Sequence, residues 1–415
     1  MLQTWKRSIL MVAAMLVVLT AGSGALAGKP VFHGIVSQGY MNSTDYNYLA
    51  PTVDGTFAYN EFLLNVSAPV SDKLRVGAQV MSRNLGGDGN EDVVLDWAYG
   101  DYRWKDWLGI RIGKVKTPFG LYNQTRDVDM VRNSILLPQA VYTESMRDVM
   151  NGFEGASIYG SFSVGDANSF EYDAFLGTVD VERTMFPVGM LTQNILAQIY
   201  GSNLPLTEYK SETKAVYGGA LRWNTFVEGL RFGASWFHGE LSGTGTVASP
   251  LGPITPTFHM DATPWYVLSA EYTTDRWLLA YEFNRAFVDM ELSGLVVPTG
   301  LPDPFPPTVE MDLPIEDRRG GWYAQTAWQF NDYFQFGGIY GVYYPDYRVR
   351  EGDGFGYKQQ DFALTIRADV TDNWLLKVEG HAMKGTGDVA AELNKGIALT
   401  DEDWYLLVAK STFYF

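Results

Sequence analysis

The sequence predicts an all-β fold, namely a transmembrane antiparallel up-and-down β-barrel of about sixteen strands, with short periplasmic turns at one end and long outer loops at the other. Polar and apolar residues alternate with period two in many segments, and short connections alternate with long ones between these segments. The last segment ends in an aromatic residue, Phe415. Period-two alternation is typical of strands with one apolar and one polar face.

An export signal is expected at residues 1–27. Two basic residues precede an apolar run from Ile9 to Leu19, and small residues follow as far as Ala27. This order is typical of a cleaved secretory signal, and the apolar run is shorter than an uncleaved membrane anchor requires. No boundary or internal repeat is visible in the remainder, so residues 28–415 are expected to form one outer-membrane barrel domain.

The net charge excludes nucleic acid as a partner. The 415 residues carry a formal charge of −17, and removal of Lys6 and Arg7 with the signal changes it to −19, which is −17 − 2. Nucleic-acid-binding surfaces are basic. The chain has no cysteine, so no disulfide or thiolate ligand is available. A soluble β-sandwich could share this composition, so the pattern of connections decides the membrane assignment.

Sixteen segments with strand character are predicted. They lie near residues 31–42, 56–69, 73–84, 92–103, 107–117, 152–164, 169–179, 213–224, 229–239, 264–274, 276–287, 319–330, 333–345, 360–370, 374–384 and 403–415. In the segment 361–370, Phe362, Leu364 and Ile366 alternate with charged or polar residues. Strands survive in lipid only when the sheet closes, because unpaired backbone groups find no water there.

The connections separate into two kinds. Tight turns such as Thr274-Asp275 and Asn331-Asp332 follow every second strand. Long loops are predicted between them, at residues 43–55, 85–91, 118–151, 180–212, 240–263, 288–318, 346–359 and 385–402. This regular alternation is typical of outer-membrane barrels, whereas a β-sandwich has no reason to keep it.

Aromatic residues near the predicted strand ends indicate girdles at the two membrane interfaces. They are Trp104, Trp107, Trp265, Trp277, Trp322, Tyr343, Tyr344 and Trp374. The final strand places Leu407, Ala409, Ser411, Phe413 and Phe415 on one face, and Lys410 and Thr412 on the other. An alternating strand closed by Phe415 resembles the signature that the barrel assembly machinery recognises, which makes that machinery an expected partner.

Three motifs resemble Gram-negative outer-membrane porins of the phosphate-selective porin O/P superfamily. The segment Gly113 to Tyr122 reads GKVKTPFGLY and resembles the G-[RK]-x-K-x-P-[FY]-G signature of that superfamily. The segments GIVSQGY at 34–40 and LDWAYGDY at 95–102 also resemble such porins. The resemblance implies a homotrimer of barrels that allow passive diffusion of small hydrophilic solutes and ions. It also implies that the third loop, residues 118–151, folds inward and constricts the pore.

Charged residues of that loop are the candidate constriction: Arg126, Asp127, Asp129, Arg132, Glu144, Arg147 and Asp148. Opposed charges across a narrow lumen act as a selectivity filter. The alternative is a charged loop that lies over the outside of the barrel.

The predicted inner faces of the strands carry equal numbers of basic and acidic residues. The basic set is Arg75, Arg83, Arg222, Arg231, Arg367, Lys377 and Lys410, and the acidic set is Glu61, Asp96, Glu271, Glu282, Asp361, Asp369 and Glu379. Lys114 and Lys116 join the basic set if a local bulge turns them inward. A phosphate-preferring channel would need a basic excess. The sequence therefore favours a mixed-charge diffusion pore, with anion preference as the alternative.

An outer-membrane barrel enzyme, a phospholipase or a protease, is the rival class. Such enzymes use a histidine with a serine or carboxylates near the rim. The chain has His33, His238, His259 and His381, and none lies in a catalytic motif. We therefore predict no enzymatic activity. A third class is a barrel scaffold for an electron-transfer or export complex. Because no C-x-x-C-H haem motif is present, any cofactor of such a complex would belong to a partner, and we predict none for this chain.

The remaining predicted partners surround the barrel. They are outer-membrane lipid and lipopolysaccharide, the latter bridged to acidic loops by divalent cations. Two acidic stretches, 87–92 and 351–354, lack the full spacing of a calcium-binding loop. We predict solvated loops there and no dedicated metal site.

Overall fold

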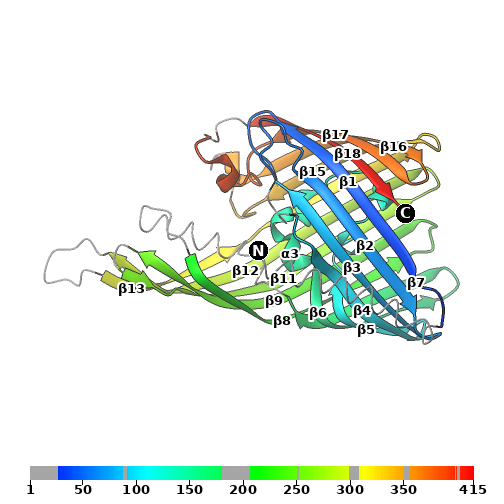
Figure 1. Cartoon of the computed structure of the whole chain (residues 1–415), viewed down its shortest axis with the longest axis horizontal. Coiled ribbons are helices and arrows are strands. Elements are labelled where there is room, and N and C mark those ends of the chain that lie inside the picture. The colour runs from blue at the N-terminus through cyan, green and yellow to red at the C-terminus, as the bar shows by residue number, and fades with distance from the viewer. Residues whose placement is uncertain are drawn as a thin grey trace.

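The computed structural model describes residues 27–86, 91–179, 206–249, 252–298, 308–349, 355–397, 399 and 402–415. The described strands form one closed antiparallel sheet (Figure 1). The expected signal lies outside the described residues except for Ala27, as do 87–90 and 351–354 of the acidic stretches. No helix among the described residues is long and apolar enough to cross a membrane.

The strands, in chain order, are β1 Val31–Ser43, β2 Tyr59–Pro69, β3 Leu74–Leu85, β4 Val94–Lys105, β5 Leu108–Lys116, β6 Gly152–Val164, β7 Asn168–Thr178, β8 Leu206–Asn224, β9 Leu230–Ser249, β10 Gly252–Ile254, β11 Thr257–Thr273, β12 Trp277–Pro298, β13 Thr308–Asp317, β14 Gly320–Gln329, β15 Phe334–Tyr344, β16 Gln359–Thr371, β17 Trp374–Lys384 and β18 Asp403–Tyr414. Short helical turns are η1 Asn123–Thr125, η2 Asp129–Val131, α2 Gln139–Tyr142, η3 Glu144–Met146, α3 Arg147–Met150, η4 Phe355–Tyr357 and η5 Ala391–Asn394.

These eighteen strands occupy sixteen positions around the barrel. β10 and β11 both pair with β9 and follow each other along it, and β13 and β14 both pair with β12 in the same way. Each of these two pairs is one interrupted strand, so 18 − 2 gives sixteen positions in the described sheet. The predicted all-β barrel of about sixteen strands is confirmed.

The sheet closes between its first and last strands. β1 pairs with β18 from Ile35↔Tyr414 to Ser43↔Leu406, and β1 pairs with β2 on its other side. The backbone of Phe415 extends the closure, because its N–H donates to the carbonyl of Gly34 and its carbonyl accepts the N–H of Gly34, both at 3.1 Å. The terminal strand therefore has both backbone edges paired, as a membrane-spanning sheet requires.

Two predicted loops, 240–263 and 288–318, were wrong, because strands occupy most of them. β9 continues to Ser249, and β12 continues for 22 residues to Pro298. A tilted strand crosses a bilayer in roughly 9–11 residues, so β12 extends well beyond a membrane. Figure 1 shows β9, β11, β12 and β13 projecting at the end opposite the C-terminus. Neighbouring strands satisfy the backbone there, and alternation continues in Met290, Leu292 and Leu295, all on the buried face.

The outer and inner faces follow the predicted alternation. Phe362, Leu364 and Ile366 point outward and are 48%, 58% and 50% exposed, whereas Lys410 and Thr412 are buried on the inner side. Exposed apolar side chains of this kind are expected where a barrel meets hydrocarbon. The sequence-based assignment of faces is therefore confirmed for β16 and β18.

Aromatic side chains form a belt at the end of the barrel where the short turns lie. Ring centroids are 5.5 Å apart for Trp104–Trp107, 5.7 Å for Trp277–Trp328 and 5.3 Å for Trp374–Phe413. This placement matches an interfacial girdle.

Trp265, which we predicted for the girdle, is instead buried on the inner face. Its ring meets Phe119 at 5.7 Å, and its Nε1 donates to Asn284 Oδ1 at 2.7 Å. Because β11 begins eight residues earlier than Trp265, this residue does not lie at a strand end. Tyr343 likewise shares its face with Ile339 and Gly341, and lines an inner cavity with them.

Candidate functional site: the lumen and its inner loop

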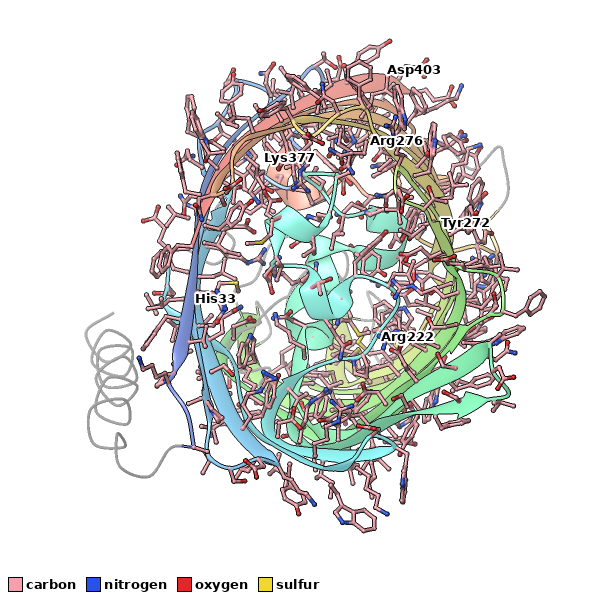
Figure 2. The ribbon with its side chains drawn as sticks, turned by 90° about the vertical axis from the view of Figure 1, so that its right-hand side faces the viewer. His33, Arg222, Tyr272, Arg276, Lys377 and Asp403 are labelled. Atoms are coloured by element: carbon pink, nitrogen blue, oxygen red, sulfur yellow. The ribbon has the colours of Figure 1, made fainter. Side chains whose placement is uncertain are left out.

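The segment 118–151, between β5 and β6, lies inside the barrel. Figure 2, seen from the end that bears the short turns, shows this cyan segment surrounded by the wall, with Lys377 pointing toward it. The Leu121 N–H donates to Glu282 Oε1 at 2.9 Å, and the Ile135 N–H donates to Glu379 Oε2 at 2.9 Å. These bonds reach β12 and β17, so the segment spans the lumen; we call it the inner loop.

Two glycines of the motif at Gly113 to Tyr122 have backbone reasons to be glycine. Gly113 has φ +135°, and a Cβ there would lie 2.2 Å from the Ala98 carbonyl oxygen. Gly120 has φ +60°, and a Cβ there would lie 2.4 Å from the Tyr142 hydroxyl. Residues with a Cβ rarely adopt such φ values. The motif therefore shapes the sharp entry of the chain into the lumen.

The first charged cluster joins the inner loop to β4 and β5. Asp127 accepts hydrogen bonds from Arg147 and Lys116, and Lys116 also donates to Asp96 Oδ1 at 2.8 Å. Burial by itself raises the pKa of the Asp127 carboxyl, but Arg147 and Lys116 outweigh burial and hold it well below its ordinary value. Asp127 is therefore ionised throughout the physiological range.

The second cluster gathers three arginines around Glu144. Arg126 donates to Glu144 Oε1 at 2.8 Å, Arg83 of β3 donates to Oε2 at 3.0 Å, and Arg147 reaches Oε2 at 3.4 Å. Burial raises the pKa of Glu144, but these arginines, Arg126 first, lower it far below its usual range. The same burial lowers the pKa of Arg126, with Glu144 opposing the shift.

The third cluster fastens the inner loop to the opposite wall. Asp129 Oδ1 lies 3.0 Å from Lys377 Nζ and 3.5 Å from Lys410 Nζ, and Oδ2 accepts a bond from Thr412 at 2.7 Å. Lys377 also donates to the carbonyls of Asp129, Arg132 and Ser134. Burial raises the pKa of Asp129, but the cations, Lys377 first, hold it well below its ordinary value.

Two wall carboxylates bind the loop backbone. Glu282 accepts bonds from the hydroxyls of Ser269 (2.5 Å), Tyr142 (2.5 Å) and Tyr323 (2.6 Å), besides the Leu121 N–H. Glu379 accepts bonds from the Ile135 and Leu136 N–H groups. Each carboxylate has several donors, which is the arrangement that a buried acid requires.

Most candidate wall residues lie against the inner loop. Arg367 donates to the Met130 carbonyl at 2.7 Å, and Arg222 donates to Gln124 Oε1 at 3.3 Å. Glu61 pairs with Lys410 at 2.5 Å. The loop or its ion clusters thus contact Arg83, Lys116, Arg222, Arg367, Lys377, Lys410, Glu61, Asp96, Glu282 and Glu379.

The other candidates are engaged within the wall, although Arg231 and Asp361 line cavities that the loop borders. Arg231 pairs with Glu271 at 2.9 Å, and Arg75 lies near the turn end of β3. Lys114 donates to the Leu95 carbonyl at 2.8 Å. Asp361 and Asp369 face the lumen beside His381 and Arg367. The side chain of Asp148 lies outside the described residues.

Sequence reasoning missed two features of the lumen. One is the tyrosine pair Tyr142 and Tyr323 on Glu282. The other is Arg111, which lies 3.8 Å from Asp101, 3.6 Å from Asp173, and 3.8 Å above the Tyr159 ring. Strand parity on β4 to β7 could have found the second group, because all four residues share the inner face. Nothing in the sequence separated Tyr142 from other loop aromatics.

Several cavities border the inner loop, and two of them concern its charged clusters. One of about 20 Å³ is lined by four arginines, Arg83, Arg126, Arg132 and Arg147, together with Glu61 and Glu144. That volume holds about one water molecule. A second, of about 270 Å³, lies between the loop and β2–β5.

Three of the four histidines lie near carboxylates. His381 Nδ1 lies 2.9 Å from Asp361 and its Nε2 lies 3.0 Å from Glu379, so both ring nitrogens are engaged. His238 lies 3.7 Å from Asp261, and His259 lies 3.7 Å from Glu240 on the strand extension. Among the described residues, no group of three or more metal-binding side chains is found.

No family model matches the sequence, and no curated protein sequence matches it. Solved structures do match over nearly the whole chain. An anion-selective porin from Comamonas acidovorans aligns with a TM-score of 0.53 at 11% identity, covering 93% of this chain and 99% of the porin. Salmonella typhi OmpF in complex with daunomycin aligns with a TM-score of 0.53 at 12% identity, covering 93% and 98%.

The in-vitro folded trimer form of OmpT, an outer membrane protein of Vibrio cholerae, gives a TM-score of 0.51 at 12% identity, covering 94% of this chain and all of that one. At these identities the similarity concerns the fold. It confirms the expected resemblance to outer-membrane porins at that level, without singling out the phosphate-selective superfamily. The chain therefore has the sixteen-stranded β-barrel fold of Gram-negative outer-membrane porins.

Proposed function

We propose that this protein is a passive, water-filled channel for small hydrophilic solutes and ions in the outer membrane. The observation that carries the proposal is the inner loop, whose ionised side chains pair with Arg83 of β3, Lys116 of β5 and Lys377 of β17 inside the barrel. Opposed acidic and basic groups at a narrow point set the field that a passing ion meets. Arg126, Asp127, Asp129, Arg132, Glu144 and Arg147 form the proposed constriction.

Anion preference is a second candidate, because one observation favours it. The buried Nε atoms of Arg126, Arg132 and Arg147 have no hydrogen-bond partner among the described residues, and all three side chains line the small cavity with Arg83. Unsatisfied guanidinium donors favour an oxyanion. Asp127, Asp129 and Glu144 offset this charge, so we expect a modest preference rather than exclusive anion passage.

Planar-bilayer recording of the refolded protein tests both statements. We expect ohmic current steps, and their absence from heat-modifiable, folded protein would overturn the channel proposal. Reversal potentials in a salt gradient measure the preference. Replacement of Arg126, Arg132 and Arg147 together by Ala should shift the reversal potential toward cation preference. Arg276→Ala, which removes a cation of the exposed turn between β11 and β12, is the control and should leave it nearly unchanged.

A homotrimer in lipopolysaccharide-containing membrane, assembled by the barrel assembly machinery through the strand that ends in Phe415, completes the proposal. The wall is uneven, since β5 has 9 residues whereas β12 has 22. A low wall on one side supports packing of barrels there, and one structural neighbour is a trimer form. Crosslinking of the refolded protein tests this, and a monomer at all concentrations would contradict it.

No enzymatic role is proposed. The only histidine in the lumen near the loop, among the described residues, is held between two carboxylates. Phospholipid and peptide turnover assays with His381→Ala and His259→Ala variants are the direct check. Turnover by the unaltered protein that either substitution abolishes would refute this assignment.

A further inference from the structure

The larger cavity beside the inner loop has the chemistry of a binding site. Its volume of about 270 Å³ equals that of roughly nine water molecules at ~30 Å³ each. It lies against the inner faces of β2–β5 and the first part of the loop. Its lining includes Asn65, Gln79, Trp97, Tyr99, Arg111 and Gln124.

The charges that border this cavity are matched within the protein. Lys116 is held by Asp127 and by Asp96 at 2.8 Å. Arg111 lies between Asp101 and Asp173, at 3.8 Å and 3.6 Å, so its charge is balanced, while its buried Nε–H has no hydrogen-bond partner among the described residues and is a donor for a neutral hydroxyl. A charged ligand would have to compete with these fixed partners, so the cavity favours a neutral one.

One wall of the cavity is an aromatic surface. Trp97 and Tyr99 are two residues apart on β4, and their ring centroids lie 5.2 Å apart at an interplanar angle of 36°. Gly77 of β3 makes room for the indole, because a Cβ there would lie 3.0 Å from Trp97 Cζ3. Adjacent rings of this kind present a broad apolar face to the lumen.

Amide groups complete the lining opposite and beside the rings. Asn65 donates to Gln79 Oε1 at 3.3 Å, and Gln79 donates to Asp96 at 2.7 Å. Gln124 of the loop accepts a bond from Arg222 at 3.3 Å. Each primary amide has two N–H donors and a carbonyl acceptor, which is more than these bonds use. Hydroxyl groups of a ligand, which both donate and accept, match such a lining.

We propose that this cavity is a binding site for a neutral, polyhydroxylated ring such as a pyranose sugar. The apolar C–H face of the sugar stacks on Trp97 and Tyr99, while its hydroxyls bond Asn65, Gln79 and Gln124. The inference rests on the proposed channel function in one respect: it makes the sugar a solute that pauses on its way through the lumen. Binding itself does not require conduction.

Two measurements on the full-length refolded protein test the site, with glucose and maltose as probes. Sugar-induced interruption of the single-channel current reports a solute in the lumen. Saturation-transfer NMR on the detergent-solubilised protein reports contact between sugar C–H groups and aromatic protons, whether or not the barrel conducts. We expect both signals with the sugars.

Trp97→Ala should weaken the sugar affinity about fivefold, since one aromatic contact is worth ~1 kcal/mol. Gly77→Val, which pushes into the indole, should also weaken it. Trp277→Ala, a ring of the outer aromatic belt, is the matched control and should bind as the unaltered protein does. Heat modifiability establishes that each variant is folded.

The outcomes separate the two proposals. If the protein conducts, but sugars neither interrupt the current nor receive saturation transfer, the sugar site is overturned and the channel proposal stands. Saturation transfer to the sugar that Trp97→Ala removes, in a protein without any conductance, supports the site and overturns the channel. Sugar binding that Trp97→Ala and Gly77→Val leave unchanged places the sugar elsewhere and refutes this assignment.

Discussion

The attachment of the inner loop to β17 and β18 depends on one buried carboxylate. Asp129 lies 3.0 Å from Lys377 and 3.5 Å from Lys410, and all three side chains are at most 1% exposed. Asp129→Asn keeps the volume and removes the charge, so two buried ammonium groups lose a partner. Removing the charge of one partner of a buried ion pair lowers stability by about 3–5 kcal/mol.

Part of this attachment survives the substitution, so the lower end of that range applies. Lys377 keeps its hydrogen bonds to the carbonyls of Arg132 and Ser134, at 2.9 and 3.2 Å. Lys410 keeps its ion pair with Glu61 at 2.5 Å. We therefore expect a loss of about 3 kcal/mol in the free energy of loop docking. Because 1.4 kcal/mol is tenfold in an equilibrium constant, the undocked fraction should rise roughly a hundredfold.

The absence of cysteine from the chain provides a clean assay. A single Ser134→Cys substitution at a buried loop position places a thiol that reacts only when the loop leaves the wall. Asp129→Asn should speed thiol labelling by about two orders of magnitude. An Asp332→Cys reporter in an exposed turn should label at the same rate in both backgrounds.

The matched control substitution is Asp369→Asn. That carboxylate pairs with Arg367 at 2.8 Å but is partly exposed, so its loss should change labelling little. Equal labelling rates in the Asp129→Asn and unaltered backgrounds would refute the claim that this cluster holds the loop. Labelling accelerated as much by Asp369→Asn would assign the effect to general loosening of the barrel.

Three further predictions concern pH and assembly. The pKa values of Asp127 and Glu144 are lowered in the folded protein, so their stabilisation is present above about pH 4 and declines as pH falls below it toward the lowered folded-state pKa. The melting temperature should therefore fall below pH 4, while the conductance of the folded channel stays constant from pH 4 to 8, and a conductance change centred near pH 6 would contradict this. Burial raises the pKa of Asp388, which accepts a bond from Tyr48 at 2.7 Å, to about 7. The melting temperature should therefore fall as pH rises through 7, and Asp388→Asn should remove that dependence, so a persisting slope would exclude this carboxyl. Phe415→Ala keeps the backbone closure but removes a ring that is 69% exposed, so it should slow membrane assembly in cells without lowering the melting temperature; normal assembly would show that the ring is not recognised.

The local alternation of polar and apolar residues was sufficient to predict the two faces of the barrel wall. The segment 361–370 showed which face meets lipid, and the structure has Phe362, Leu364 and Ile366 outward. Period-two alternation carries that information residue by residue. The extensions of β9 and β12 were missed because pairing beyond the membrane depends on neighbouring strands. The proline-rich sequence at 296–314 also favoured a loop. Pro314 is tolerated in β13, which among the described strands pairs only with β12.

The site was predicted less completely than the wall. The charged residues of the loop could be named, but their partners could not, because Asp129 and Lys377 are 248 residues apart. Lys116 illustrates the difficulty. The alternation of the strand did not decide whether the Lys116 side chain points into the lumen or toward lipid. In the structure it points inward at the end of β5 and binds Asp96 and Asp127.

The sequence by itself determined the strands that cross the membrane, their faces, the order of short turns and the identity of the charged loop, since each depends on contacts between near neighbours in the chain. Only the tertiary structure decided that the loop enters the lumen, which carboxylate meets which cation, and that Trp97 and Tyr99 border a cavity. Those features arise where the closed sheet brings distant strands to a common interior. Closure sets these distances, and no local pattern encodes them.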